Sequence, residues 1–95
     1  MEHDARDVSV EIEPRIRTFI ARDLLFTEGG FAYGDDVSLL GEGIVDSIGV
    51  LELVDFVSTQ FGISVGPDEI TPENFDSVTA LARYIRRKQA LAAPG

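Results

Sequence analysis

The amino-acid sequence predicts an all-α protein: a four-helix bundle with three longer helices, one short helix and a long loop between helices one and two. Three observations support this prediction. Apolar residues recur at helical spacing in three separate segments. Glycine and proline interrupt any regular period between those segments. The chain has 95 residues, which is room for one small domain.

The first helix is expected to begin near Ile12 or Glu13 and to reach Leu24. Pro14 is tolerated only in the opening turn of a helix, and Glu11 and Glu13 then lie near its positive end. One face is apolar and comprises Ile12, Ile16, Phe19, Ile20 and Leu24. The expected organisation is a flexible N-terminus (1–10), one folded domain (11–90) and a flexible C-terminus (91–95).

A long loop is expected from Phe26 to Val45, with the sequence FTEGGFAYGDDVSLLGEGIV. Five glycines break any period there. So long a connection is uncommon in a small domain unless it is functional or packs through its own side chains. The side chains expected to anchor it on the helices are Phe31, Val37, Leu39 and Leu40.

The second helix is expected from Ser47 to Phe61, with Gly62 as its stop. Its predicted apolar face comprises Val50, Leu51, Val54, Val57 and Phe61. A wheel of 100° per residue groups Ile48, Glu52, Asp55 and Thr59 on the opposite side. Ile48 is therefore predicted to be an exposed aliphatic residue beside two carboxylates, although single surface hydrophobics are common.

Two prolines limit the next helix to a turn or two, beginning at Pro67 or Pro72. Ser77 is a candidate N-cap for the last helix, whose apolar side comprises Val78, Leu81, Ala82 and Ile85, with Leu91 as a candidate to continue it. The basic residues from Arg83 to Lys88 are expected to suit the negative end of that helix.

Charge is distributed unevenly along the chain. The sequence holds 17 Asp and Glu against 8 Lys and Arg, a net charge of −9, and no basic residue lies from Asp23 to Ala82. A field of one sign repels nucleic acids and attracts basic protein surfaces. The ordinary alternative is that these carboxylates keep a small protein in solution.

Several classes of function are excluded by composition. Without cysteine there is no disulfide framework, thiolate metal site or cysteine nucleophile, and the single histidine is His3. Asp35 and Asp36 lack the alternation of a calcium loop, and no nearby histidine is expected to activate Ser47. We therefore expect a soluble cytoplasmic monomer that is not an enzyme, holds no metal ion and does not span a membrane.

Ser47 lies where the glycine-containing loop meets the second helix, in the segment Gly43-Ile44-Val45-Asp46-Ser47-Ile48. Either Asp46 or Ser47 is a suitable N-cap. A hydroxyl there has a second use, because the N–H groups and dipole at a helix start favour an attached phosphate.

From about Ile12 to Ile85 the chain resembles the acyl and peptidyl carrier proteins. Their Asp-Ser-Leu motif is matched by Asp46-Ser47-Ile48, with Ile for the usual Leu, and the acidic and apolar run VLELVDFV follows. The segment ISVGPDEITPENFDSVTALARYI is similar to the short third and closing fourth helices of that family. Helix spacing, long loop and acidic centre agree with the motif.

The resemblance implies that Ser47 receives a 4′-phosphopantetheine arm from coenzyme A, with Asp46 supporting the motif. It implies as partners a Mg²⁺-dependent phosphopantetheinyl transferase, an acyl- or aminoacyl-adenylating ligase and a downstream transferase or synthase. Partners are expected to bind Ile48, Glu52 and Asp55. Further candidates for that surface are Glu42, Glu69 and Glu73, for which solubility is the alternative. Whether the bundle shelters the cargo stays open.

The bulky Ile44 and Val45 before the motif, and Gly49 after it, look more like discrete carriers of specialised pathways, and LLGEGIVDSIGVLELV is similar to D-alanyl carriers. A free-standing protein is expected, although Ala92 to Gly95 could be the stub of a linker. A non-covalent acidic adaptor, in which Ser47 is only a cap, is the alternative from another class.

Overall fold

The computed structural model describes residues 12–92 and confirms the predicted all-α bundle. Its elements are α1 (Ile12–Phe19), η2 (Ile20–Leu24), α2 (Ser47–Phe61), η3 (Pro67–Glu69), α3 (Pro72–Phe75) and α4 (Val78–Ala92). The expected flexible segment 1–10 lies outside the described residues. Of the expected flexible segment 91–95, the first two residues end α4 and the rest lie outside.

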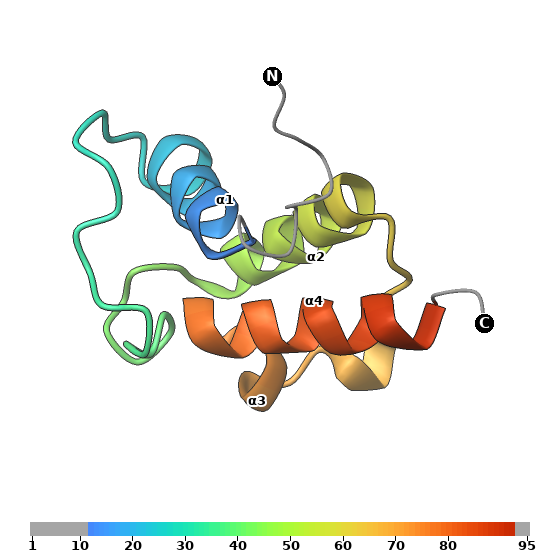
Figure 1. The fold of residues 1–95 in the computed structure, drawn as a ribbon. Helices are drawn as coiled ribbons and strands as arrows, with labels where there is room; N and C mark the ends of the chain where they lie inside the picture. The colour runs from blue at the N-terminus through green and yellow to red at the C-terminus, as the bar shows by residue number, and fades with distance from the viewer. Residues whose placement is uncertain (1–11, 93–95) are drawn as a thin grey trace, which may run out of the picture.

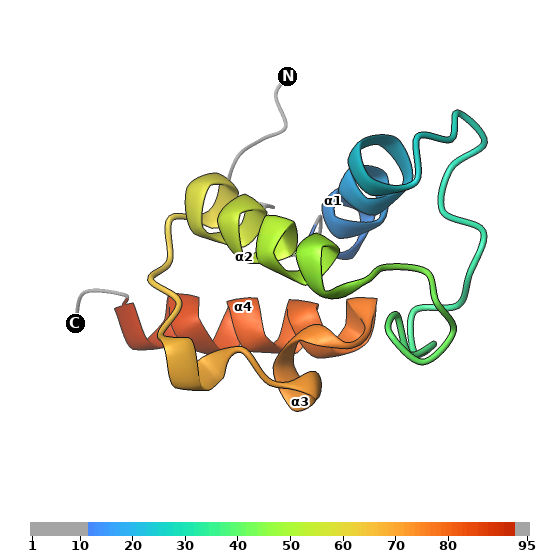
Figure 2. The ribbon, with the colours of Figure 1, turned by 180° about the vertical axis from the view of Figure 1, so that it is seen from behind.

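Three longer helices enclose one apolar core, with α1 and α2 on the same side of α4 in the view of Figure 2 and α1 in direct contact with α4. The helices α2 and α4 run in the same general direction, and the long loop covers the end at which both begin (Figure 1). The helices α1, α2 and α4 and the turn η2 contribute aliphatic side chains to the interior, among them Ile16, Ile20, Leu53, Leu81 and Ile85, all fully buried. Because these side chains come from distant parts of the chain, the core joins all the helices.

The first helix follows the predicted apolar face, with Ile12, Ile16 and Ile20 buried. It widens over its last five residues into the π-helical turn η2, which the sequence did not predict. The backbone closes this turn by N–H donation from Leu25 to Ile20 O at 2.9 Å. Two residues after the end of η2 lies Phe26, whose φ of 55° is left-handed.

The buried stripe of α2 differs from the predicted face. It is spaced by four residues and comprises Gly49, Leu53, Val57 and Phe61. Leu51, predicted to be buried, is 60% exposed, whereas Leu53, absent from the predicted face, is fully buried. Apolar residues surround most of this helix, so periodicity alone does not determine which stripe packs inward. Gly62 ends the helix as predicted, with φ of 65°.

Asp76 holds the long loop against the start of α4. Its backbone oxygen accepts from Leu39 N at 2.8 Å, and its carboxylate accepts from Leu40 N at 2.8 Å and Ser38 Oγ at 2.5 Å. Leu39 is fully buried, and Phe31 and Val37 pack against the core as predicted. The prediction that Leu40 anchors the loop through its side chain is wrong. That side chain is 43% exposed, and it is the backbone N–H of Leu40 that bonds to Asp76.

The two prolines between α2 and α4 each begin a short helix. Pro67 opens η3 and Pro72 opens α3. The Oγ of Ser77 accepts from Ala80 N at 3.0 Å, which confirms the predicted cap of α4. The expectation that Leu91 continues the apolar side of this helix is wrong, because its side chain is 81% exposed in the last turn.

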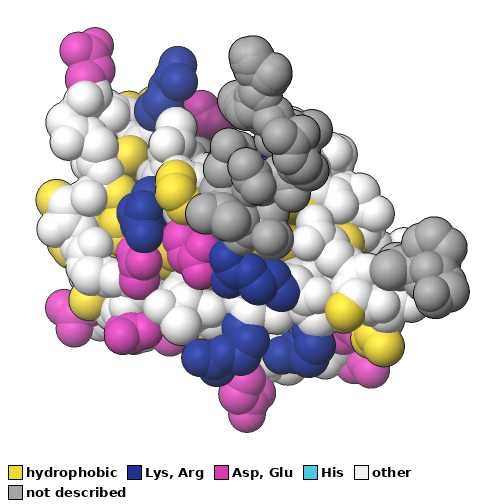
Figure 3. Space-filling view, viewed as in Figure 1, with side chains coloured by type: hydrophobic (Ala, Val, Ile, Leu, Met, Phe, Trp, Pro, Cys, Tyr) yellow, Lys and Arg dark blue, Asp and Glu magenta, His cyan; other side chains and the backbone are white. Residues whose placement is uncertain are grey.

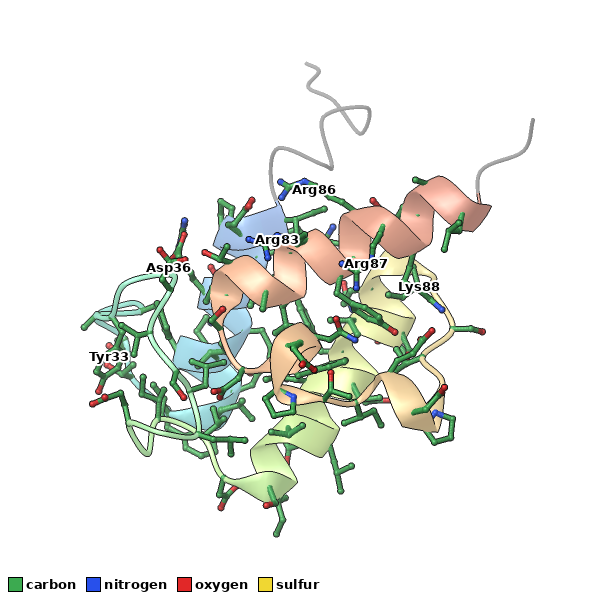
Figure 4. The ribbon with its side chains drawn as sticks, turned by 90° about the horizontal axis from the view of Figure 1, so that it is seen from below. Tyr33, Asp36, Arg83, Arg86, Arg87 and Lys88 are labelled. Atoms are coloured by element: carbon green, nitrogen blue, oxygen red, sulfur yellow. The ribbon has the colours of Figure 1, made fainter. Side chains whose placement is uncertain are left out.

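The basic residues of α4 lie in its middle turns, so their predicted role at the negative helix end is wrong. The helix continues to Ala92, and its last turn contains no cation. Two of these side chains instead form ion pairs with other elements: Arg86 pairs with Glu13 of α1 at 2.8 Å, and Lys88 with Glu69 of η3 at 3.0 Å. Figure 4 shows Arg86 and Lys88 pointing to different sides of α4, and Figure 3 shows Lys and Arg side chains gathered over that helix.

A further ion pair joins α1 to the loop. The guanidinium of Arg17 donates two hydrogen bonds to the Asp35 carboxylate, at 2.8 and 2.7 Å. These bonds lower the pKa of Asp35, and hydrogen bonding to Arg86 lowers the pKa of Glu13. Each cation therefore favours the charged form of the carboxylate that it contacts.

Glu69 predicts a pH dependence of stability. Its carboxylate accepts from Tyr84 Oη at 2.7 Å, Gly66 N at 3.0 Å and Lys88 Nζ at 3.0 Å. The Tyr84 hydrogen bond, then those of Gly66 and Lys88, lower the pKa of Glu69 to about 2. A lowered carboxyl pKa stabilises the fold above the unfolded value, and this contribution is lost as pH falls towards the folded value.

We therefore expect the melting temperature to fall between about pH 5 and pH 2, and to fall less in Glu69→Gln. Circular dichroism across this range measures the effect. The matched control is Glu73→Gln, which removes an exposed carboxylate from neighbouring α3. Parallel pH profiles for Glu69→Gln and the parent would contradict the assignment.

Candidate functional site

Asp46 determines where α2 begins. Its extended backbone (φ −108°) ends the loop, and its Oδ1 accepts from Gly49 N at 2.9 Å. Its backbone oxygen accepts from Val50 N at 3.0 Å, the first hydrogen bond of the helix. The sequence left the cap open between Asp46 and Ser47, and the structure assigns it to Asp46.

Ser47 is the first residue of α2 and is exposed. Within residues 12–92 its hydroxyl makes no hydrogen bond. The backbone N–H groups of Ser47 and Ile48 precede the first helical hydrogen bond, so they have no partner inside the helix. Ser47 therefore presents an unoccupied hydroxyl beside two donors at the positive end of a helix.

Gly49 lets the first turn of α2 lie close to the loop and to η2. A Cβ at this position would lie 3.1 Å from Val45 Cβ and 3.7 Å from Leu24 Cδ1. Val45 is itself buried, so it has little room to retreat. In the sequence Gly49 stands out only as an unusual residue after the motif, because the close approach to Val45 and Leu24 arises from the tertiary structure.

A hollow of about 250 Å³ lies between the end of η2 and the first turns of α2, lined by both sequence neighbours of Ser47, Asp46 and Ile48, but not by Ser47 itself. It brings together three predicted site residues, Asp46, Ile48 and Glu52. Phe26, whose side chain is 83% exposed, lines the same hollow. Phe26 is not among the residues predicted for the site, because it stands at the start of the expected loop, where no sequence pattern indicates exposure.

A larger groove, of about 960 Å³, separates α1 and η2 from α2. Ile48, Glu52 and Asp55 line it, and all three are exposed as predicted. Below them the rings of Phe19 and Phe56 stack with centroids 4.2 Å apart. The groove therefore combines an aromatic contact between the helices with carboxylates on the α2 side.

Two cations line the α1 side of the groove, Arg15 and Arg22. Arg15 donates to Gln60 Oε1 at 3.1 Å and lies 4.5 Å from the centroid of the Phe61 ring. Glu52 and Asp55 make no ion pair with another described residue. Their charges are therefore available to an approaching surface.

The three other candidate carboxylates line neither the hollow nor the groove. Glu42 is exposed in the turn before α2, and Glu73 is exposed on α3. Glu69 makes the three internal hydrogen bonds described above. The structure thus brings Ile48, Glu52 and Asp55 together but leaves these three residues apart from them.

The chemistry of the site is that of an acceptor hydroxyl. The described residues include no histidine or cysteine, and none of their carboxylates gather into a set of three that could hold a metal ion. No helix within residues 12–92 has the length and apolar character needed to cross a membrane.

Comparison with known proteins relates the chain to small carriers. No family model matches it. A D-alanyl carrier protein of Abiotrophia defectiva is 31% identical over 55 residues, which make up 58% of this chain and 70% of that protein. A probable acyl carrier protein, PigG, of Serratia sp. (strain ATCC 39006) is 38% identical over 47 residues. This second match covers 50% of the chain and about half (54%) of the relative.

The cap assignment makes a paired prediction. Asp46→Ala should lower the free energy of unfolding by about 1 kcal/mol, because Gly49 N loses its acceptor. Ser47→Ala should change it by less than about 0.5 kcal/mol, since its hydroxyl makes no hydrogen bond within the described residues. Urea unfolding followed by circular dichroism measures both. Equal losses in the two variants would show that Ser47 shares the capping role.

Proposed function

Because the chain belongs to the acyl carrier protein family, we propose that it carries acyl or aminoacyl groups as thioesters on a 4′-phosphopantetheine arm attached to Ser47. Its role is that of a carrier protein. The proposal extends this role to a stand-alone, monomeric, cytoplasmic carrier that is a substrate of other enzymes and has no catalytic residue of its own.

Attachment of the arm to Ser47 is supported by the different roles of Asp46 and Ser47 at the start of α2. Asp46 makes the cap, so the hydroxyl of Ser47 is not needed to begin α2. A phosphate on Ser47 Oγ would lie close to the N–H groups of Ser47 and Ile48, which lack helical partners. The exposed hydroxyl therefore fits a phosphodiester, although the nearby Asp46 carboxylate opposes the added charge.

Attachment would proceed by phosphoryl transfer. Ser47 Oγ forms a new bond to the phosphorus next to the pantetheine of coenzyme A, and the bond to the adenosine phosphate portion breaks. The serine proton passes to the transferase, which also supplies the Mg²⁺ site. When bound, the arm supplies the thiol that this cysteine-free chain lacks.

Partner enzymes would bind the outward side of α2. Ile48, Glu52 and Asp55 line one groove, and an apolar anchor beside unpaired carboxylates suits a basic protein surface. Glu69 is left out of this surface because its carboxylate is already bound within the fold. The proposed partners are a phosphopantetheinyl transferase, an acyl- or aminoacyl-adenylating ligase and a downstream transferase or synthase.

The proposal predicts a covalent mass gain. Incubation with coenzyme A, Mg²⁺ and a broad-specificity phosphopantetheinyl transferase should add one phosphopantetheine to the parent protein and none to Ser47→Ala. Intact-protein mass spectrometry measures the gain. With the fold verified by circular dichroism and the transferase active on another carrier, an unmodified parent would favour the non-covalent acidic adaptor.

The charged surface predicts an electrostatic effect on the same reaction. Glu52→Lys should lower the transferase kcat/KM about tenfold at low salt, and the loss should shrink as salt rises. The control is Asp36→Lys, which changes net charge equally on the loop at a site that lines neither hollow nor groove (Figure 4). Equal losses in both variants would show that net charge, not the α2 surface, is recognised.

A further inference from the structure

Phe26 is an exposed aromatic residue in an unfavourable backbone conformation. Its side chain is 83% exposed, and its φ of 55° is the only positive φ of a non-glycine residue among residues 12–92. A bulky side chain rarely adopts this conformation, because Cβ approaches the following carbonyl. Phenylalanine therefore costs stability here, and its exposed ring recovers little by burial.

The backbone around Phe26 is that of a helix end. Thr27 N donates to Ala21 O at 2.8 Å, across the left-handed residue. Glycine is the usual residue at such a position, as at Gly62 after α2, where φ is 65°. Local structure thus favours glycine at position 26 and does not explain phenylalanine.

The surroundings of Phe26 connect it to the Ser47 end of α2. Phe26 and Ile48 line one hollow, and Ile48 and Leu51 line the adjoining groove. The side chains of Ile48 and Leu51 are 66% and 60% exposed. One exposed hydrophobic residue is ordinary, but three that border connected hollows form an apolar patch, which typically marks an interaction site.

Charged groups border this apolar patch (Phe26, Ile48 and Leu51). Asp23 and Glu52 line both the hollow and the groove, and Asp55 lines the groove. Arg15 of α1 and Arg22 of η2 also line the groove, so the carboxylates Asp23, Asp46, Glu52 and Asp55 outnumber the cations around the two hollows. The excess of carboxylates fits a partner with an apolar socket bordered by Lys and Arg.

We propose that Phe26 is a docking residue for the phosphopantetheinyl transferase and enters an apolar socket of that enzyme together with Ile48. The inference rests on the proposed function. An enzyme that reacts with the Ser47 hydroxyl itself must bring its own surface against the residues beside Ser47. Phe26 and Ile48 border the hollow at that place.

Phe26→Gly separates docking from folding. Glycine adopts a positive φ freely, so this variant should fold and melt at the same temperature or up to about 4 °C higher. Phe26→Gly and its control are both made in the Ser47→Ala protein, so that transfer of phosphopantetheine to Ser47 does not interfere with the measurement of binding. The matched control is Leu91→Ala, since Leu91 is 81% exposed in the last turn of α4 and lines none of these hollows.

Isothermal titration calorimetry with a purified broad-specificity transferase, coenzyme A and Mg²⁺ measures the affinity. We expect Phe26→Gly to raise Kd about tenfold and Leu91→Ala to leave it unchanged. Equal Kd values for Phe26→Gly and its Ser47→Ala parent would overturn the inference, as would the absence of binding by that parent or an equal loss in Leu91→Ala.

The mass gain on Ser47 distinguishes this inference from the proposed function. Binding that depends on Phe26, without modification of the intact serine protein, would support the docking face and reject the phosphopantetheine arm. Modification of Ser47 with no contribution from Phe26 to binding would support the arm and reject the docking residue.

Discussion

The hydrogen bond from Gly49 N to Asp46 Oδ1 is the contact on which the site depends, because it sets where α2 begins. With Asp46 as the cap, Ser47 becomes the first helical residue and its hydroxyl is left without a structural task. The rotation of the helix about its axis is set by its buried stripe, Gly49, Leu53, Val57 and Phe61. Packing of that stripe leaves Ile48, Glu52 and Asp55 exposed.

A second constraint comes from the placement of charge. Three cations of α1 and α4 pair with carboxylates of other elements: Arg17 with Asp35, Arg86 with Glu13 and Lys88 with Glu69. These pairs tie the small bundle together. The helix α2 contains no cation, and its outward carboxylates make no ion pair with another described residue. One set of charges therefore stabilises contacts within the fold, while the other is available for binding.

Much of the fold could be predicted because its signals are local. Gly62, Pro67, Pro72 and Ser77 end or begin helices through constraints on their own backbone or on the next turn. The exposed face of α2 with Ile48, Glu52 and Asp55 was predicted for a similar reason, since residues at helical spacing share one face of a helix wherever the helix packs. Predictions that depended on a distant contact fared worse: Leu51 and Leu40 are exposed, and the α4 cations bind other elements.

By itself, the sequence determined the all-α class, the order of the helices, Asp46 and Ser47 as the two candidates for the cap, and the resemblance to carrier proteins. Only the tertiary structure decided which stripe of α2 is buried, which residue caps it and where Phe26 lies. The physical reason is that backbone preferences and helical period act over a few residues. Burial and the hollows beside Ser47 depend on side chains from separate elements that meet only when the bundle closes.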